Sequence, residues 1–263
     1  MAYLRSIGFH AEKLHEDAVW RRLQRIAQWM ARNDMQATFF VYPFRAQVAG
    51  SDITNRVRTL ASLGHEIGQH THFYAGAKVE KPDKTNDLSD ENIIHCLHRD
   101  FETLKMMGFS PKGFTAGGWL VNETVWDTLV DLGFVYDCSV RFPGPKKSAT
   151  TPFVRWQAAL EFYTNARGRI LCIPTTCSLG EWFRWSRRLQ VGTSKGYQLI
   201  YLHDYDLLLT RVYFMTWLLL KRVDDPRRAY EIYAEEIGDT AGRDEDLSSN
   251  RTTETRLRRS ELR

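Results

Sequence analysis

The sequence predicts an α/β fold, in which a single domain forms a distorted (β/α)7-type barrel of parallel strands. Amphipathic segments that end at glycine or at Asn-Asp alternate with short apolar strands along most of the 263-residue chain. Neither a GxGxxG nor a GxxxxGK[ST] loop follows any of these strands, so a nucleotide-binding sheet is not supported. At this length, about seven such repeats favour a closed or nearly closed barrel over a doubly wound sheet.

The first repeats lie before Gly64. Asp17 is expected to cap a helix that stops near Asn33, and a strand over 37–42 follows. The apolar positions of this helix recur at helical spacing: Val19, Leu23, Ile26 and Met30. Asp52 is expected to cap the next helix, which Gly64 ends, and residues 66–72 form the next strand.

Later repeats follow the same rule. A helix from about Asp90 to Gly108 is expected to bury Ile94, Leu97, Phe101 and Leu104. Asn122 is expected to cap a helix that ends at Gly133. The remaining strands are expected at 114–116, 134–140, 170–175 and 198–203.

Composition limits the class of protein. The hydrophobic fraction of 43% supports a large core, and the net charge of +4 does not indicate nucleic-acid binding. No apolar run approaches the roughly 20 residues of a membrane span, and no leader-like segment precedes the first strand, so a cytoplasmic protein is expected. The four cysteines are expected to be reduced core thiols. Residues 1–238 form the expected barrel domain, and residues 239–263 a disordered polar tail.

Polar residues with metal-binding chemistry stand where strands end. His70 and His72 alternate along an extended segment, so both imidazoles point to one side and suit a divalent metal. His10 and Glu12 form a second alternating pair after the first strand. Active sites of such barrels lie at the carboxyl ends of the strands, which would bring these residues together with His203.

Five segments, taken in order, resemble the motifs of the polysaccharide deacetylase family, carbohydrate esterase family four. They are Ala37–Val41, Gly64–Thr71, Gly113–Gly118, Phe134–Val140 and Tyr201–His203. The resemblance runs from about Ile7 to Leu207 and implies a metal-dependent deacetylase on a barrel. It implies His70 as a ligand and His203 as the general acid.

This chain departs from the family pattern at three places. Gly8-Phe9-His10-Ala11-Glu12 stands where the family has Thr-Phe-Asp-Asp-Gly, with its base and metal aspartates. Tyr74 occupies the position of the family's second metal histidine, and His72 is the replacement candidate. Thr115 replaces the arginine that orients the base. The sequence therefore describes a divergent member whose general base cannot simply be carried over.

The expected centre holds a divalent metal, with zinc as the first expectation, on His70, His72 and Glu12. His10 is a fourth ligand or the general base, and His203 protonates the leaving amine. Thr115, Tyr74, Trp119 and Trp182 are the expected substrate-binding residues. An aromatic face can stack on a sugar ring, but a tryptophan is also an ordinary core residue.

Three functions remain open. The leading one is a hydrolase that removes an acetyl or other acyl group from the nitrogen of an amino sugar, with a small-molecule or oligosaccharide substrate such as a cytosolic precursor of surface glycan. The second is a catalytically inactive barrel that binds a glycan or a protein partner, to which the altered motifs point. The third is a hydrolase of a non-sugar C–N bond, because one fold can carry several chemistries.

Overall fold

The computed structural model of the chain describes residues 4–43, 51–75, 85–143, 153–185, 196–223 and 226–238. The strands are β1 (Leu4–Ala11), β2 (Thr38–Val41), β3 (Glu66–Thr71), β4 (Gly113–Ala116), β5 (Tyr136–Asp137), β6 (Glu161–Asn165), β7 (Gly168–Cys172), β8 (Cys177–Ser178) and β9 (Tyr197–His203). The helices are α1 (Asp17–Arg32), α3 (Ser51–Ser62), α4 (Asp90–Met106), α5 (Glu123–Asp131), α6 (Leu179–Trp185) and α7 (Thr210–Leu220), with short 3₁₀ turns η2 (Gly117–Trp119) and η3 (Asp204–Leu208). Residues 229–238 form a further helix. The tail expected over 239–263 lies outside the described residues.

Across the described residues the strands form one sheet in the order β6-β7-β5-β4-β3-β2-β1-β9-β8. All pairings are parallel except that of β6 with β7. Only residues 173–176 separate β7 from β8, although the two strands stand toward opposite edges of the sheet. Thr175 N donates to Val140 O at 2.8 Å, and Thr176 N donates to Leu199 O at 3.0 Å. This segment joins the two edges and curls the sheet into the predicted distorted barrel.

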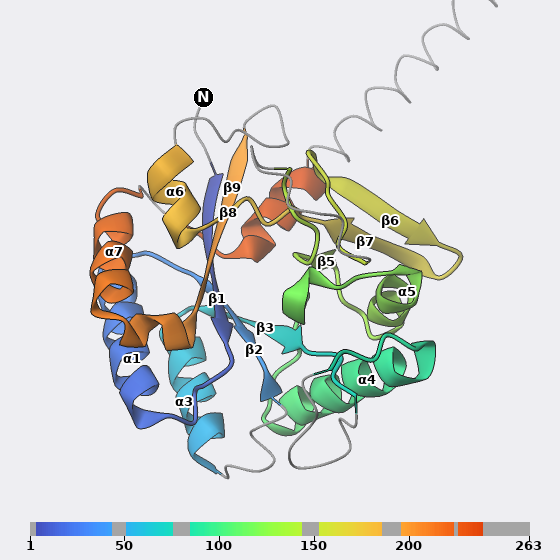
Figure 1. The fold of residues 1–263 in the computed structure, drawn as a ribbon, viewed down its shortest axis with the longest axis horizontal. Helices are drawn as coiled ribbons and strands as arrows, with labels where there is room; N and C mark the ends of the chain where they lie inside the picture. Colours follow the sequence, from blue (N-terminus) through green and yellow to red (C-terminus); the bar gives the residue numbers. More distant parts are fainter. Residues whose placement is uncertain are drawn as a thin grey trace, which may run out of the picture.

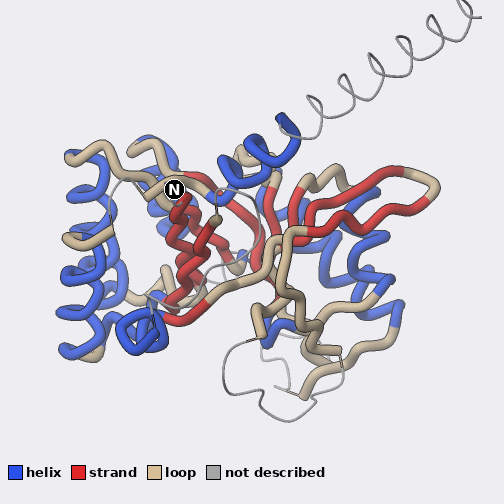
Figure 2. Tube along the Cα trace, turned by 90° about the horizontal axis from the view of Figure 1, so that it is seen from above, coloured by secondary structure: helices blue, strands red, loops and turns tan. Residues whose placement is uncertain are grey.

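The helices surround the curled sheet as the alternating pattern predicts. In Figure 1, α1, α3 and α7 lie on one side of the strands, and α4 and α5 lie on the other. The view from above in Figure 2 shows the strands between these two groups of helices. Every residue of β2 is buried, as expected for a parallel strand that is covered on both faces.

The amino ends of the strands are closed by the helix over 229–238. Ala229 N donates to Thr38 Oγ1 at 2.7 Å, and Tyr230 N donates to Glu66 Oε2 at 3.2 Å. Tyr136 OH donates to the other oxygen of Glu66 at 2.7 Å. Ala229 and Ile232 belong to the same buried cluster as Phe40, Tyr136 and Leu199. The barrel is therefore filled and covered at this end, and both carboxylate oxygens of Glu66 are paired there.

Local chemistry explains both ends of α5. Asn122 caps α5, as predicted, by accepting a hydrogen bond from Val125 N at 3.0 Å. Gly133 follows this helix at φ +80°, a conformation that favours glycine. Asp17 was expected to cap α1, but it is the first helical residue, and Glu16 takes the cap position without a side-chain bond.

Several boundary predictions were wrong. Ile94 is exposed and Ile93 is buried instead, whereas Leu97 and Leu104 of α4 are buried as expected. The strand expected over 134–140 contracts to β5, because the chain turns after Asp137 to donate from Ser139 N to the Asp137 carboxylate. The antiparallel strand β6 was not predicted. The four cysteines are free and buried, as expected for core thiols.

Candidate metal centre

The expected site residues meet at the carboxyl ends of β1, β3 and β9. His10 lies in β1 and pairs in register with His203, the last residue of the neighbouring β9. Glu12 is the first residue after β1, and His70 and His72 lie at the end of β3 and just beyond it. Three segments distant in sequence therefore converge at one rim of the barrel, as the fold predicts.

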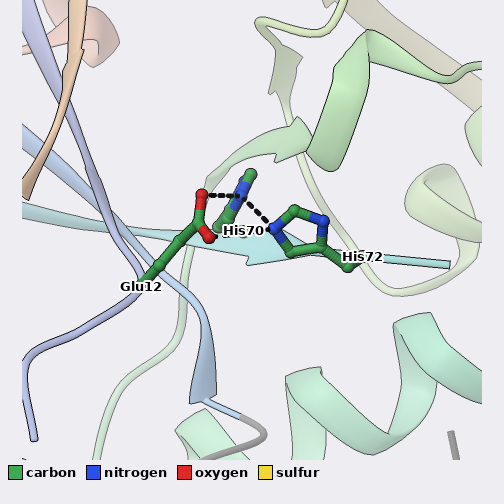
Figure 3. A group of neighbouring side chains, drawn as sticks. All are labelled: Glu12, His70 and His72. Carbon is green, nitrogen blue, oxygen red and sulfur yellow. Dashed lines mark hydrogen bonds and ion pairs between the residues drawn. The ribbon is translucent and has the colours of Figure 1, made fainter. Parts of the chain in front are cut away.

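Glu12, His70 and His72 present their ligand atoms to one another (Figure 3). The two Nε2 atoms of His70 and His72 are 3.2 Å apart. Glu12 Oε1 lies 3.5 Å from His70 Nε2, and Glu12 Oε2 lies 3.4 Å from His72 Nε2. Ligands held tetrahedrally at about 2.0–2.1 Å from one zinc ion lie roughly 3.3 Å apart. The donor set and its spacing therefore fit a divalent cation.

The orientation of His70 is fixed by the neighbouring strand. His70 Nδ1 lies 2.9 Å from the backbone oxygen of Thr115 in β4. Because a carbonyl oxygen can only accept, Nδ1 carries the hydrogen, and Nε2 is left with its lone pair toward Glu12. Thr115 was expected to bind substrate through its side chain, but that side chain is fully buried and does not line the cleft. Its contribution is the backbone carbonyl.

His72 is held between aromatic rings and a glycine. The ring of Tyr74 stacks on His72 with centroids 4.7 Å apart, and Tyr42 meets it edge-on at 5.1 Å. A Cβ on Gly117 would stand 2.2 Å from His72 Nδ1, so only glycine leaves room for this imidazole. The glycine follows β4 directly. The sequence carries the signal in Gly117-Gly118, but its relation to His72 depends on β4 lying beside β3.

Burial and charge set the protonation of the cluster. Burial is the largest influence on His70 and lowers its pKa, which favours the neutral imidazole that a metal requires. Burial opposes ionisation of Glu12, but the adjacent imidazoles of His70 and His72 outweigh it and hold the pKa of the carboxyl well below its usual value. The site therefore supplies one anionic oxygen ligand and at least one neutral nitrogen ligand.

His10 lies beside the ligands but is not one of the three that converge. Its ring stacks on His70 with centroids 4.8 Å apart and on Tyr201 at 5.6 Å. Burial, and then the nearby charges of His70 and His203, lower its pKa well below the ordinary histidine value. Because its nitrogens are not among the converging ligand atoms, the position of His10 favours the expected role of general base over that of a fourth ligand.

His203 bridges the ligand cluster and an aspartate. Its Nε2 lies 3.7 Å from Glu12 Oε1, and its Nδ1 lies 3.4 Å from Asp206 Oδ2. Tyr205 stacks on the ring at 4.9 Å. Asp204, by contrast, accepts hydrogen bonds from the backbone nitrogens of Lys13 and Tyr205.

A cleft of about 690 Å³ opens over these side chains and is called the metal cleft below. Trp119 and Tyr74, two of the expected substrate-binding residues, line it, and their role stays a prediction. Trp119 also carries the guanidinium of Arg141 over its ring, 4.7 Å from the centroid. Trp182 was expected to bind substrate as well, but only 7% of it is exposed, and it packs from α6 into the hydrophobic core. That prediction was wrong because α6 turns this residue inward.

Comparison with known proteins identifies the domain. Residues 16–136 match the family model described as polysaccharide deacetylase. This segment includes His70 and His72, whereas Glu12 and His203 lie outside it. No curated protein matches the chain in sequence.

Solved structures agree on the fold. A candidate polysaccharide deacetylase from Mycobacterium smegmatis superposes with a TM-score of 0.62 at 14% identity, covering 91% of this chain and 92% of that one. Peptidoglycan deacetylase PdaC from Bacillus subtilis gives a TM-score of 0.54 at 11% identity, covering 93% and 95%. The CE4 family pseudoenzyme BA3943 from Bacillus anthracis gives 0.54 at 12% identity, covering 88% and 66%. Residues 16–136 of this chain therefore match the polysaccharide deacetylase family model, and the chain shares the fold of these solved structures.

Proposed function

We propose that the protein is a metal-dependent hydrolase that removes an acetyl group, or another acyl group, from the nitrogen of an amino sugar. The observation that carries the proposal is the set of Glu12, His70 and His72, whose ligand atoms lie at the mutual distances of a tetrahedral site. Zinc is the first candidate, because two imidazoles and one carboxylate are a common catalytic zinc set with one position left open.

A bound divalent cation would polarise the acyl carbonyl and make a water molecule more acidic. The remaining steps belong to the protein. His10, neutral because burial lowers its pKa, takes the proton of the attacking water. His203 gives a proton to the leaving amine nitrogen, and Asp206, 3.4 Å from His203 Nδ1, keeps the imidazole oriented.

The rest of the metal cleft suits a sugar ring. Trp119 and Tyr74 offer aromatic faces along its lining, and Lys13 and Tyr205 offer polar groups. A cytosolic precursor of surface glycan, as the sequence suggests, stays a prediction for the natural substrate. Among the helices of the described residues, none has the length and apolar character needed to cross a membrane.

The test combines metal analysis with a substrate panel. Purified protein should carry about one equivalent of zinc or another divalent metal, and it should release acetate from at least one N-acetylated amino sugar. Chelation should abolish release, and added metal should restore it. A metal-loaded protein that cleaves only non-sugar amides would redirect the proposal to another C–N bond. Protein that binds no divalent metal would support an inactive, ligand-binding barrel.

A further inference from the structure

A second cleft adjoins the metal cleft at His203. It has a volume of about 760 Å³, within the range of small-molecule sites, and lies between α6 and α7. Its lining also includes Tyr201, Leu202 and Asp206 from β9 and the turn after it. Because His203 lines both clefts, one ligand can reach from the metal ligands into this second space, called the α6–α7 cleft below.

The walls of the α6–α7 cleft are mainly apolar. Leu179 from α6 faces it, as do Val212 and Met215 from α7. Leu209, at the entrance to α7, also lines it and is 60% exposed. Covering exposed apolar side chains lowers the free energy in proportion to the area that is removed from water. This surface therefore favours an apolar ligand.

Two cations stand at the same cleft. Arg184 of α6 and Arg211 of α7 both line it, and both side chains are exposed. Among the described residues, no ion pair involves either guanidinium, whereas Asp206, the carboxylate of the lining, lies 3.4 Å from His203. The cleft therefore combines apolar walls with positive charge, and a planar guanidinium is well suited to a phosphate.

We propose that the α6–α7 cleft binds an alkyl phosphate, so that the natural substrate is an amino sugar joined through phosphate to a lipid chain. This inference rests on the proposed function. His203 gives its proton to the amine, so the sugar that keeps the amine lies toward His203. The group attached to that sugar then extends past His203, where the arginines meet the phosphate and Leu179, Val212 and Met215 contact the chain.

The test uses decyl phosphate below its micelle concentration and metal-free protein, so that phosphate cannot bind to a metal instead. Calorimetry should show decyl phosphate binding at least about tenfold more tightly than inorganic phosphate or uridine monophosphate, since each buried methylene adds about 0.8 kcal/mol. Arg211→Gln and Met215→Glu should each weaken decyl phosphate binding about tenfold.

Matched controls lie outside the cleft lining. Phe214→Glu places a carboxylate on the same helix at an exposed position, and Arg25→Gln removes an exposed guanidinium from α1. Both should change the affinity less than about twofold, because exposed side chains away from the ligand contribute little. Decyl phosphate binding that is no tighter than that of inorganic phosphate, or that is equal in all four variants, contradicts the proposal. If uridine monophosphate binds more tightly than decyl phosphate, the α6–α7 cleft is a site for a nucleotide and not for a lipid phosphate.

The readout separates this inference from the proposed function. Binding of decyl phosphate without any deacetylation would leave the α6–α7 cleft assigned and remove the proposed reaction. Deacetylation of simple amino sugars without decyl phosphate binding would leave the reaction and remove the lipid-linked substrate.

Discussion

The two ends of strand β3 use the same residue types for opposite purposes. At its start, His65 Nδ1 accepts from Ala37 N at 3.2 Å, and Nε2 lies 3.1 Å from Ala27 O, so Nε2 carries the hydrogen. At its end, His70 donates from Nδ1 to Thr115 O, and its Nε2 faces only His72 and Glu12. The rings of His65 and His70 are both buried, but only His70 keeps a nitrogen lone pair, on Nε2, for a ligand.

The glutamates of the two ends differ in the same way. Glu66 opens β3 and is surrounded by uncharged donors: Thr38 Oγ1, Tyr136 OH and Tyr230 N. Burial is the main influence and raises its pKa. Glu12, at the other rim, has its pKa lowered by two imidazoles. A buried polar group with neutral partners stabilises the fold, whereas groups that face one another without neutral partners mark a binding site.

The strongest test of this comparison replaces the histidine at each end of β3 with alanine, in two separate variants. His70→Ala should lose bound metal and activity together, because one of three protein ligands is gone. His65→Ala should keep its metal while the free energy of unfolding falls by about 2–4 kcal/mol, since two backbone groups lose their partner. Metal content, turnover and chemical denaturation measure these effects. Metal loss in His65→Ala would break the comparison.

A smaller effect is expected at the proposed acid. His203→Ala should lower kcat by about 10²–10⁴-fold, the usual contribution of a general acid, with metal content unchanged because His203 is not among the three converging ligands. Asp206→Asn should lower kcat less, since it removes only the partner of His203 Nδ1. Paired assays of turnover and bound metal decide this. Unchanged turnover in His203→Ala would make the histidine structural.

The third test concerns the glycine beside His72. Gly117→Ala places a methyl group where His72 now lies, so the ring must move, and metal affinity should fall about 10–100-fold, as when a supporting group around a metal ligand is changed. Gly238→Ala is the matched control, because a Cβ there meets nothing within 4 Å. Competition with a metal-binding dye measures both affinities. Equal affinities would mean that His72 is not a ligand.

The sequence predicted the features that depend on local pattern. Helix periodicity, glycine stops and the alternation of His70 with His72 were enough for the barrel and for the convergence at its rim. What it could not predict depends on packing between distant segments. Gly117 matters only because β4 lies beside β3, and Trp182 is buried only because α6 turns it inward. Thr115 acts through a carbonyl, which any residue would supply.

The last prediction uses the pH dependence of stability at the closed end. Because burial raises the pKa of Glu66, the folded protein holds this proton more tightly than the unfolded chain does. Glu66 therefore makes the protein less stable as the pH rises from about 4.5 through the folded pKa. Glu66→Gln removes this decline while keeping the shape of the side chain, so the variant should gain stability relative to the native protein as the pH rises from 4 to 8.

Glu12→Gln should show the opposite trend in metal-free protein, losing stability relative to the native protein as the pH rises. The lowered pKa of Glu12 stabilises the native fold above about pH 4.5, and this advantage disappears on acidification. Urea denaturation of the three metal-free proteins from about pH 2 to pH 8 measures both trends, because the contribution of Glu12 changes below about pH 4.5. If the two variants changed the pH dependence in the same direction, the electrostatic contrast between the two ends of the barrel would be wrong.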